Sequence, residues 1–296
     1  MTVVVDTTVI EVAPLAAGRG RIRRLLSSPT GVVGLAIVIV LAVISILAAL
    51  GLTPHPPLEQ NPPERFAAPS TSHLVGTDQF GRDVLSRVME GVLASLRISV
   101  VAVAIAATIG SAAGVAAGFL GGWTDRAVGL VTNIMFAFPA ILLALAVVTA
   151  LGRGWMNTVI AIAVVYTPIF VRVARGPVLT VRELDFVKAG RVLGFGRPRL
   201  LIRHVLPNVT APIVVQVALA LSWAILTESA LSFLGLGTQP PAPSLGLMVS
   251  EGRTLVSQGW WLMAAPASAI VLSVIGLNLI GDGLRDALDP TRSQRR

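Results

Sequence analysis

The chain of 296 residues contains no cysteine and only one lysine, Lys188. The missing cysteines exclude disulfides, iron–sulfur clusters and thiolate zinc sites. The chain also lacks a Gly-x-x-x-x-Gly-Lys-Ser/Thr phosphate loop, so nothing in it supplies ATP hydrolysis. Its three histidines, His55, His73 and His204, support no nucleophile–base pair. We therefore expect no catalytic residue, no cofactor and no metal bound by this chain.

Charge is also scarce. Charged residues make up 13% of the chain, and hydrophobic residues 54%, whereas a soluble globular protein averages roughly 25% charged residues. The mean hydropathy is +0.80, so most of the chain must face something other than water. A net charge of +8 would elsewhere suggest nucleic acid. Here the basic residues gather at the ends of apolar spans, so we expect a membrane protein with no nucleic-acid partner.

Six segments are apolar and long enough to cross a membrane, since about 20 residues span the hydrocarbon core. They are residues 31–52, 98–120, 127–151, 157–171, 209–231 and 262–280. The first is longer than the roughly 7–15 apolar residues of a signal peptide, so we expect an uncleaved anchor. The sequence predicts an all-α membrane protein. Its parts are an N-terminal segment (1–30), a first transmembrane helix (31–52), an extracytoplasmic loop (53–97), a five-helix core (98–281) and a tail (282–296).

The distribution of basic residues predicts the orientation. The segments 1–30, 121–126, 172–208 and 281–296 hold 17 of the 23 Lys and Arg residues. By the positive-inside rule these segments are cytoplasmic, and so are both termini.

Two patterns surround the start of the second span. Between positions 83 and 96 apolar residues recur with helical period, which predicts an amphipathic helix at the outer interface. The span itself carries small residues four apart, on one helical face. They are Ala102, Ala106, Gly110, Gly114 and Gly118. Packing within the chain is the favoured interpretation, and a subunit interface or a gating helix is the alternative.

The segment 172–208 holds eight basic residues between two apolar spans. Its composition predicts a helix over 182–193, a glycine- and proline-rich turn over 194–198 and a second helical stretch over 199–205. Two short helices joined by such a turn form a protruding elbow. Phe186 and Phe195 are then available to fill a groove on a partner.

The spacing in this loop resembles the cytoplasmic loop of ABC-importer permeases. That pattern is Glu-Ala-Ala, three residues, Gly, nine residues, an apolar position, any residue and Leu-Pro. Here the pattern falls on Lys188, Ala189, Gly190, Gly194, His204, Leu206 and Pro207. Residues 76–83 (GTDQFGRD), 228–237 (ESALSFLGLG) and 281–290 (GDGLRDALDP) resemble further blocks of the dipeptide/oligopeptide/nickel group, and most closely the second permease of that group.

The resemblance implies a type I importer permease with six transmembrane helices, in a bacterial plasma membrane. It implies a second permease as heterodimeric partner, two ATPase subunits that bind ATP and Mg, and an extracytoplasmic solute-binding protein. The substrate would be a di- or oligopeptide, with nickel or another small solute as the alternative. The coupling residues would be Phe186, Lys188, Ala189, Gly190, Gly194, Phe195, His204, Leu206 and Pro207.

Two positions depart from the pattern. Lys188 stands where the family has an acid, so we expect an acidic or neutral contact on the ATPase, or lipid headgroups around the lysine. Gly190 stands where the family has alanine, and a glycine inside a helix costs about 1 kcal/mol relative to alanine. We therefore expect a looser elbow.

Polar residues within the spans are candidates for the translocation path: Asn133, Thr149, Ser222 and Glu228. Glu228 is the only acid inside an apolar span, and both an interior and an interfacial position fit it. An ion-coupled secondary transporter is the main rival function, with a membrane enzyme behind it. In the extracytoplasmic loop, His73 with Asp78 and Asp83 could bind a cation, but aspartates that cap a turn are favoured.

Overall fold

The computed structural model describes residues 28–288. The expectations for residues 1–27 and 289–296 lie outside the described residues. The described part is built from helices and loops, with a single isolated β-bridge, between Thr77 and Asp83. The helices are α2 (Pro29–Ala49), η1 (Pro62–Glu64), α3 (Val84–Leu120), α4 (Gly122–Phe136), α5 (Ala140–Leu151), α6 (Trp155–Val181), α7 (Asp185–Val192), α8 (Arg197–Leu200), η2 (Leu201–Val205), α9 (Leu206–Phe233), α10 (Leu245–Thr254) and α11 (Trp261–Leu288).

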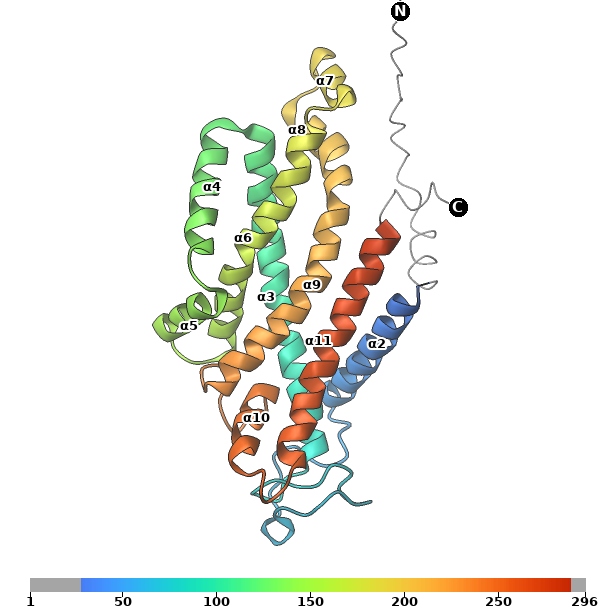
Figure 1. Ribbon diagram of the computed structural model, residues 1–296, viewed down its shortest axis with the longest axis vertical. Coiled ribbons are helices and arrows are strands. Elements are labelled where there is room, and N and C mark those ends of the chain that lie inside the picture. Colours follow the sequence, from blue (N-terminus) through green and yellow to red (C-terminus); the bar gives the residue numbers. More distant parts are fainter. Residues whose placement is uncertain (1–27, 289–296) are drawn as a thin grey trace, which may run out of the picture.

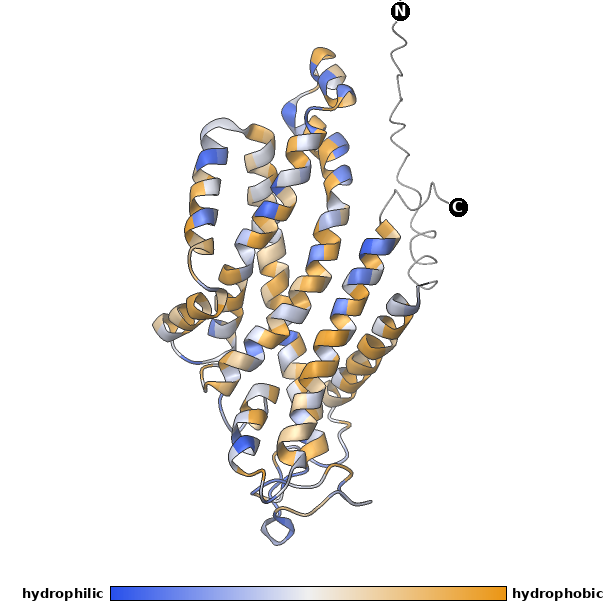
Figure 2. Cartoon of the chain, in the orientation of Figure 1, coloured by the Kyte–Doolittle hydropathy of each residue, from blue (hydrophilic) through white to orange (hydrophobic). Residues whose placement is uncertain are grey.

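The long helices lie side by side in one bundle (Figure 1). Five helical stretches of the described chain are long and apolar enough to cross a membrane, or six if α4 and α5 count as one bent span. Figure 2 shows apolar residues along most of their length, with hydrophilic residues gathered around α7 and α8 and in the loop before α3. The predicted all-α membrane fold is confirmed, with five or six candidate spans in the described residues.

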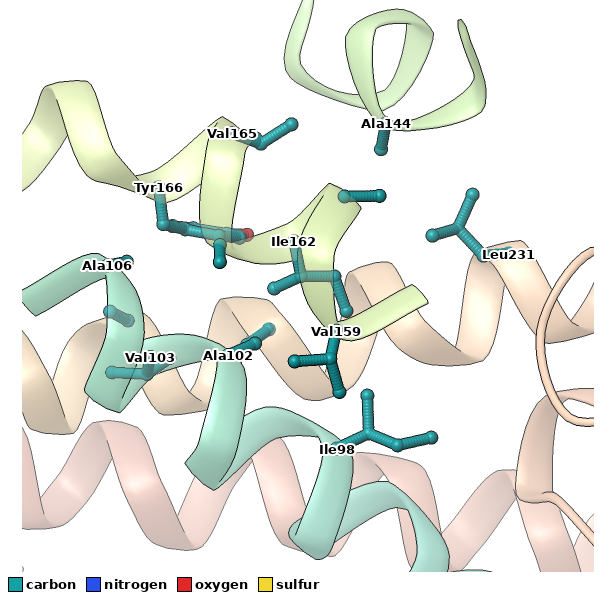
Figure 3. Close-up of a cluster of buried hydrophobic side chains, with 14 of the residues drawn as sticks. Ile98, Ala102, Val103, Ala106, Ala144, Val159, Ile162, Val165, Tyr166 and Leu231 are labelled. Atoms are coloured by element: carbon teal, nitrogen blue, oxygen red, sulfur yellow. The ribbon is translucent and has the colours of Figure 1, made fainter. Parts of the chain in front are cut away.

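The centre of the bundle is the contact of α3 with α6 and α9. In Figure 3, Ala102 and Ala106 of α3 lie opposite Ile162 and Tyr166 of α6. Further along α3, a Cβ on Gly110 would lie 2.5 Å from the carbonyl oxygen of Thr167. The small-residue face therefore packs within the chain, because only hydrogen or methyl side chains let the two backbones approach this closely.

α3 corrects one prediction. Residues 84–96 are helical, but they form the first part of a continuous 37-residue helix rather than a separate element. No proline interrupts them, and the carboxylate of Asp83 caps the first turn by accepting from the backbone N–H of Ser86, at 2.8 Å. At 1.5 Å per residue the helix is about 55 Å long, well beyond the roughly 30 Å of hydrocarbon. Its first turns extend the bundle instead of lying across it.

The third predicted span, 127–151, is not a single straight helix. α4 and α5 meet at an angle of 94° across a short break. Pro139 lies at this break and immediately precedes α5. Proline lacks the N–H of a helical hydrogen bond and disfavours helical geometry in the residue before it. Pro139 therefore lies at a bend that divides the span.

The fourth span is longer than predicted. α6 extends from Trp155 to Val181 and passes through Pro168 and Pro177. Membrane helices tolerate proline because neighbouring groups satisfy the freed carbonyls. As a result, residues 172–181 belong to α6, and residues from 197 onward are helical into α9. The non-helical part of the predicted loop is much shorter than 172–208. The helix α10 was not predicted from the sequence.

Candidate functional site

The segment between α6 and α9 projects from one end of the bundle, the end where α2 begins and α11 ends (Figure 1). We call residues 182–207 the elbow. α7 carries Asp185 in its first turn and Arg191 in its last, which suits the helix dipole at both ends. Gly194 follows with a φ of +78°, a conformation that favours glycine. The predicted pair of short helices around a glycine turn is present.

The inner side of the elbow is a packed cluster. Val187 of α7 and Leu200 of α8 have almost no exposed surface, and they share a buried cluster with Phe119 of α3 and Val178 of α6. Val205 joins the same cluster just before α9. The elbow is therefore attached to three membrane helices through apolar contacts, so a displacement of α7 is transmitted to them.

Gly190 lies at a close contact inside the elbow, and the looser elbow expected from its low helix propensity stays a prediction. It is buried, and a Cβ at this position would lie 2.7 Å from Cδ2 of Leu200 and 3.3 Å from Cδ2 of Phe195. The missing side chain lets α7 and α8 approach more closely than alanine would allow. The lower helix propensity of glycine at this position is therefore accompanied by closer packing of α7 against α8.

Aromatic rings brace the turn. Phe195 stacks on His204 with ring centroids 6.2 Å apart and planes at 11°. The guanidinium of Arg199 lies over the ring of Phe195, 4.4 Å from its centroid. Phe186 also approaches His204, at 6.3 Å, but keeps 38% of its surface exposed. Of the two phenylalanines, Phe186 is the one that offers its ring outward.

The tip of the elbow exposes apolar side chains, and of these only Ala189 was predicted from the sequence. Val192 is 88% exposed and Leu193 is 71% exposed. Leu184 and Ala189 are also exposed. Val192 and Leu193 lie directly before Gly194, at the end of an amphipathic helix, and this position was the signal from which their exposure could have been predicted. Exposed apolar groups on a protruding tip are typical of a surface that a partner covers.

Lys188 projects from the elbow with about half of its side chain exposed. Its Nζ lies 3.8 Å from Oε2 of Glu183. Oε1 of the same carboxylate accepts from Nε of Arg182, at 3.2 Å. Glu183 therefore faces two cations, and the local charge of the elbow stays positive. Leu206 and Pro207 lie half-buried at the start of α9.

The path candidates do not gather in one place. Asn133 and Thr149 are exposed on α4 and α5. Ser222 is buried on α9 and donates to Oδ1 of Asn278, at 3.0 Å. Glu228 has no exposed surface. Its carboxylate accepts from the hydroxyl of Ser95 at 2.6 Å and from that of Ser232 at 2.8 Å.

At the opposite end of the bundle, aspartates of the loop before α3 hold the loop in place by accepting hydrogen bonds. Oδ1 of Asp78 accepts from the backbone N–H of Phe80 at 2.8 Å, and its Oδ2 accepts from Nε of Arg82 at 2.6 Å. Asp83 caps α3, so the capping interpretation is confirmed. Hydrogen bonding to Asp83 raises the pKa of His73 above its ordinary value.

Residues 110–294 match the family described as binding-protein-dependent transport system inner membrane component. Residues 18–69 match the N-terminal transmembrane domain of oligopeptide transport permease C.

Three relatives illustrate the similarity. The dipeptide transport system permease protein DppC of Alkalihalophilus pseudofirmus is 43% identical over 272 residues, covering 92% of this chain and 89% of the relative. The di/tripeptide transport system permease protein DppC of Pseudomonas aeruginosa is 42% identical over 266 residues, covering 88% of each. The glutathione transport system permease protein GsiD of Escherichia coli O6:K15:H31 is 44% identical over 222 residues, covering 75% of this chain and 73% of the relative.

Proposed function

This chain belongs to the family of binding-protein-dependent transport system inner membrane components, and on that premise we propose that it forms half of a translocation path for di- or oligopeptides. It is the permease subunit of an ABC importer, a multi-pass membrane protein that works with ATPase and binding-protein partners. ATP hydrolysis takes place on those partner subunits. The family membership excludes the ion-coupled secondary transporter and the membrane enzyme.

The names of the relatives support the peptide substrate. They refer to dipeptides, to di- and tripeptides and to glutathione, itself a small peptide. This favours peptides over nickel or another small solute. We assign the remaining assembly by the same resemblance: a second permease in a heterodimer, two ATPase subunits holding ATP and Mg, and one extracytoplasmic binding protein.

The distribution of basic residues supports the orientation that we propose. The elbow end of the bundle carries most of the Lys and Arg residues and faces the cytoplasm, with both chain termini on that side. The loop before α3 and α10 lie at the other end and face the binding protein (Figure 1).

The observation that carries the coupling role is the contrast between the two sides of the elbow. Val192, Leu193 and Phe186 are exposed on the outside, while Val187 and Leu200 are buried against the membrane helices. An ATPase groove that receives the exposed side chains can move the elbow, and the buried contacts pass this movement to α3, α6 and α9. Coupling is then mechanical. Lys188 adds a positive charge beside the contact.

The test is uptake of a labelled dipeptide by cells that carry this permease with its partners. Val192→Asp and Phe186→Asp each place a charge in the contact, so ATPase co-purification and dipeptide uptake should both fall at least tenfold. Gly194→Pro should have the same effect, because proline fixes φ near −65° where the turn needs +78°. The amount of permease in the membrane should not change.

Leu58→Asp is the matched control, since Leu58 is an exposed apolar residue of the opposite loop. Its co-purification with the ATPase subunits should stay at the wild-type level. Normal co-purification and uptake in all three elbow variants would overturn the coupling assignment. Uptake that unlabelled di- and tripeptides fail to compete would overturn the peptide substrate instead.

A further inference from the structure

We propose that the loop before α3 contains a binding site for a divalent transition-metal ion of the zinc type, formed by His55, His73 and Asp83. One ligand atom from each of the three residues lies within 4.8 Å of the others. This inference does not depend on the transport assignment, and it departs from the expectation that the chain binds no metal.

The donor atoms are separated by distances that suit one ion. Oδ1 of Asp83 lies 2.9 Å from Nδ1 of His73 and 3.7 Å from Nδ1 of His55. Two ligands on a tetrahedral zinc ion, each about 2.0–2.1 Å from the metal, are roughly 3.3 Å apart. The observed distances lie on either side of this value, so small side-chain rotations are sufficient.

His55 supplies the observation that is hardest to explain otherwise. Its Nδ1 is inaccessible to solvent and has no hydrogen-bond partner in the described structure. The backbone around it is held in place: its N–H donates to Oγ of Ser86 at 3.1 Å, and its carbonyl accepts from Oγ1 of Thr53 at 2.8 Å. A buried polar atom without a partner is costly, and a metal ion would satisfy it.

The hydrogen-bond partners of the proposed ligands have the arrangement that is usual around metal sites. Nε2 of His73 faces Oε2 of Glu64 at 3.1 Å. Histidine ligands usually donate their second N–H to a carboxylate, which fixes the tautomer and the ring orientation. Oδ2 of Asp83 is held by the backbone N–H and the hydroxyl of Ser86, at 2.8 and 2.7 Å, so the helix cap does not use Oδ1. Oδ1 is hydrogen-bonded to Nδ1 of His73, and a metal ion between these two atoms would replace the shared proton.

The donor set selects the kind of metal. Two imidazole nitrogens with one carboxylate suit zinc and neighbouring first-row ions, whereas calcium and magnesium prefer oxygen ligands alone. Three protein ligands leave a fourth position for water or an external ligand. The bound ion joins the segment after α2, the loop and the first turn of α3 at one point.

The test is zinc binding by the purified full-length chain, carrying an affinity tag without histidine and first treated with a chelator. After incubation with zinc sulfate and desalting, we expect one zinc ion per chain by elemental analysis. The natural chain has no cysteine, and its histidines are limited to three. Competing ligands are therefore few, and His204→Gln controls for the remaining histidine.

Three variants separate metal binding from folding. His55→Gln removes a ligand whose side chain makes no hydrogen bond, and Asp83→Asn keeps a good helix cap; both should lose the zinc. Glu64→Gln should weaken zinc affinity about 10–100-fold, as an outer partner of a metal-bound histidine does. Added zinc should raise the thermal unfolding temperature of wild type and of His204→Gln, but not that of His55→Gln.

The proposal is overturned if the wild type holds no zinc above the detergent blank. It is also overturned if His55→Gln retains the ion, or if His204→Gln loses it. His55→Gln without zinc should unfold at the same temperature as chelator-treated wild type, which shows that its loss of zinc does not come from misfolding.

Discussion

The face of α3 that packs on α6 shows how much depends on a single missing methyl group. A Cβ on Gly114 would overlap the carbonyl oxygen of Val171, and a Cβ on Gly118 would lie 2.9 Å from a methyl group of Val178. The first of these neighbours is backbone and cannot rotate away. The spacing of small residues therefore encodes the distance between two helices, independent of any ligand.

Gly114→Ala should lower the free energy of unfolding by roughly 1–3 kcal/mol, because the added methyl forces the backbones apart. The measurement is denaturant unfolding of the purified permease in detergent micelles. Gly176→Ala is the matched control, since Gly176 of α6 has open space around its Cβ position. It should be neutral or stabilise the helix by up to about 1 kcal/mol. Equal effects of the two substitutions would contradict this account of the packing.

Individual residues also mark the limit of prediction from the sequence. The sequence left Glu228 between an interior and an interfacial position, and the structure buries it beside Ser95, which lies 133 positions away along the chain. Hydropathy along a single helix contains no information about such a partner. His55 was not considered as a ligand for the same reason, because only the folded loop brings it to His73 and Asp83.

At the scale of elements, apolar length located every long helix, but it failed where proline decides the geometry. Pro139 lies at a break between two helices, whereas Pro168 and Pro177 lie inside one. The same residue type has opposite outcomes, because neighbouring helices decide whether the freed backbone groups are satisfied. In the elbow, the motif spacing placed α7 and its glycine turn correctly. The exposed Val192 and Leu193 depend on which face of α7 packs inward, which the motif does not state.

The broken span α4–α5 is attached near its start by an ion pair. Nη2 of Arg175 on α6 donates to Oδ2 of Asp125 on α4, at 2.7 Å, in a contact that involves both carboxylate oxygens. Thr132 is the buried residue of α4, so the helix has little apolar attachment of its own. The pair therefore holds an element that packing leaves loosely fixed.

A double-mutant cycle with Asp125→Asn and Arg175→Gln tests this attachment. Each single substitution should destabilise the permease, and the double variant should be less destabilised than the sum of the two. We expect a coupling free energy of about 0.5–1 kcal/mol, as for a partly exposed pair. The measurement is again denaturant unfolding in micelles. Strictly additive effects would mean that the pair contributes nothing.

At the scale of the whole molecule, the two ends of the bundle differ in chemistry. One end carries the basic elbow, and the other carries the compact loop with its buried histidine and aspartates (Figure 1). The proposed orientation places the first in the cytoplasm and the second outside. Since the chain is free of cysteine, single cysteines report on each end without background.

A cysteine at Ser70 should react with a membrane-impermeant maleimide added to intact cells. A cysteine at Arg197 should react only after the cells are opened. Both positions are exposed, so access to the reagent depends on the side of the membrane alone. The natural cysteine-free chain, carried through the same steps, gives the background. Labelling of the two positions in the reverse order would invert the proposed topology.

Because α3 is unbroken, it can tilt as one rigid body and move both of its ends together. Near one end of the helix, Phe119 packs into the elbow cluster, and at the other end Asp83 caps the first turn within the histidine-containing loop. A tilt of about 10° around the middle of a 37-residue helix moves each end by roughly 5 Å in opposite directions. In the proposed orientation, a displacement of the cytoplasmic end of α3 moves the end at the external loop in the opposite direction. The helix then links the surface proposed to meet the ATPases to the surface proposed to meet the binding protein.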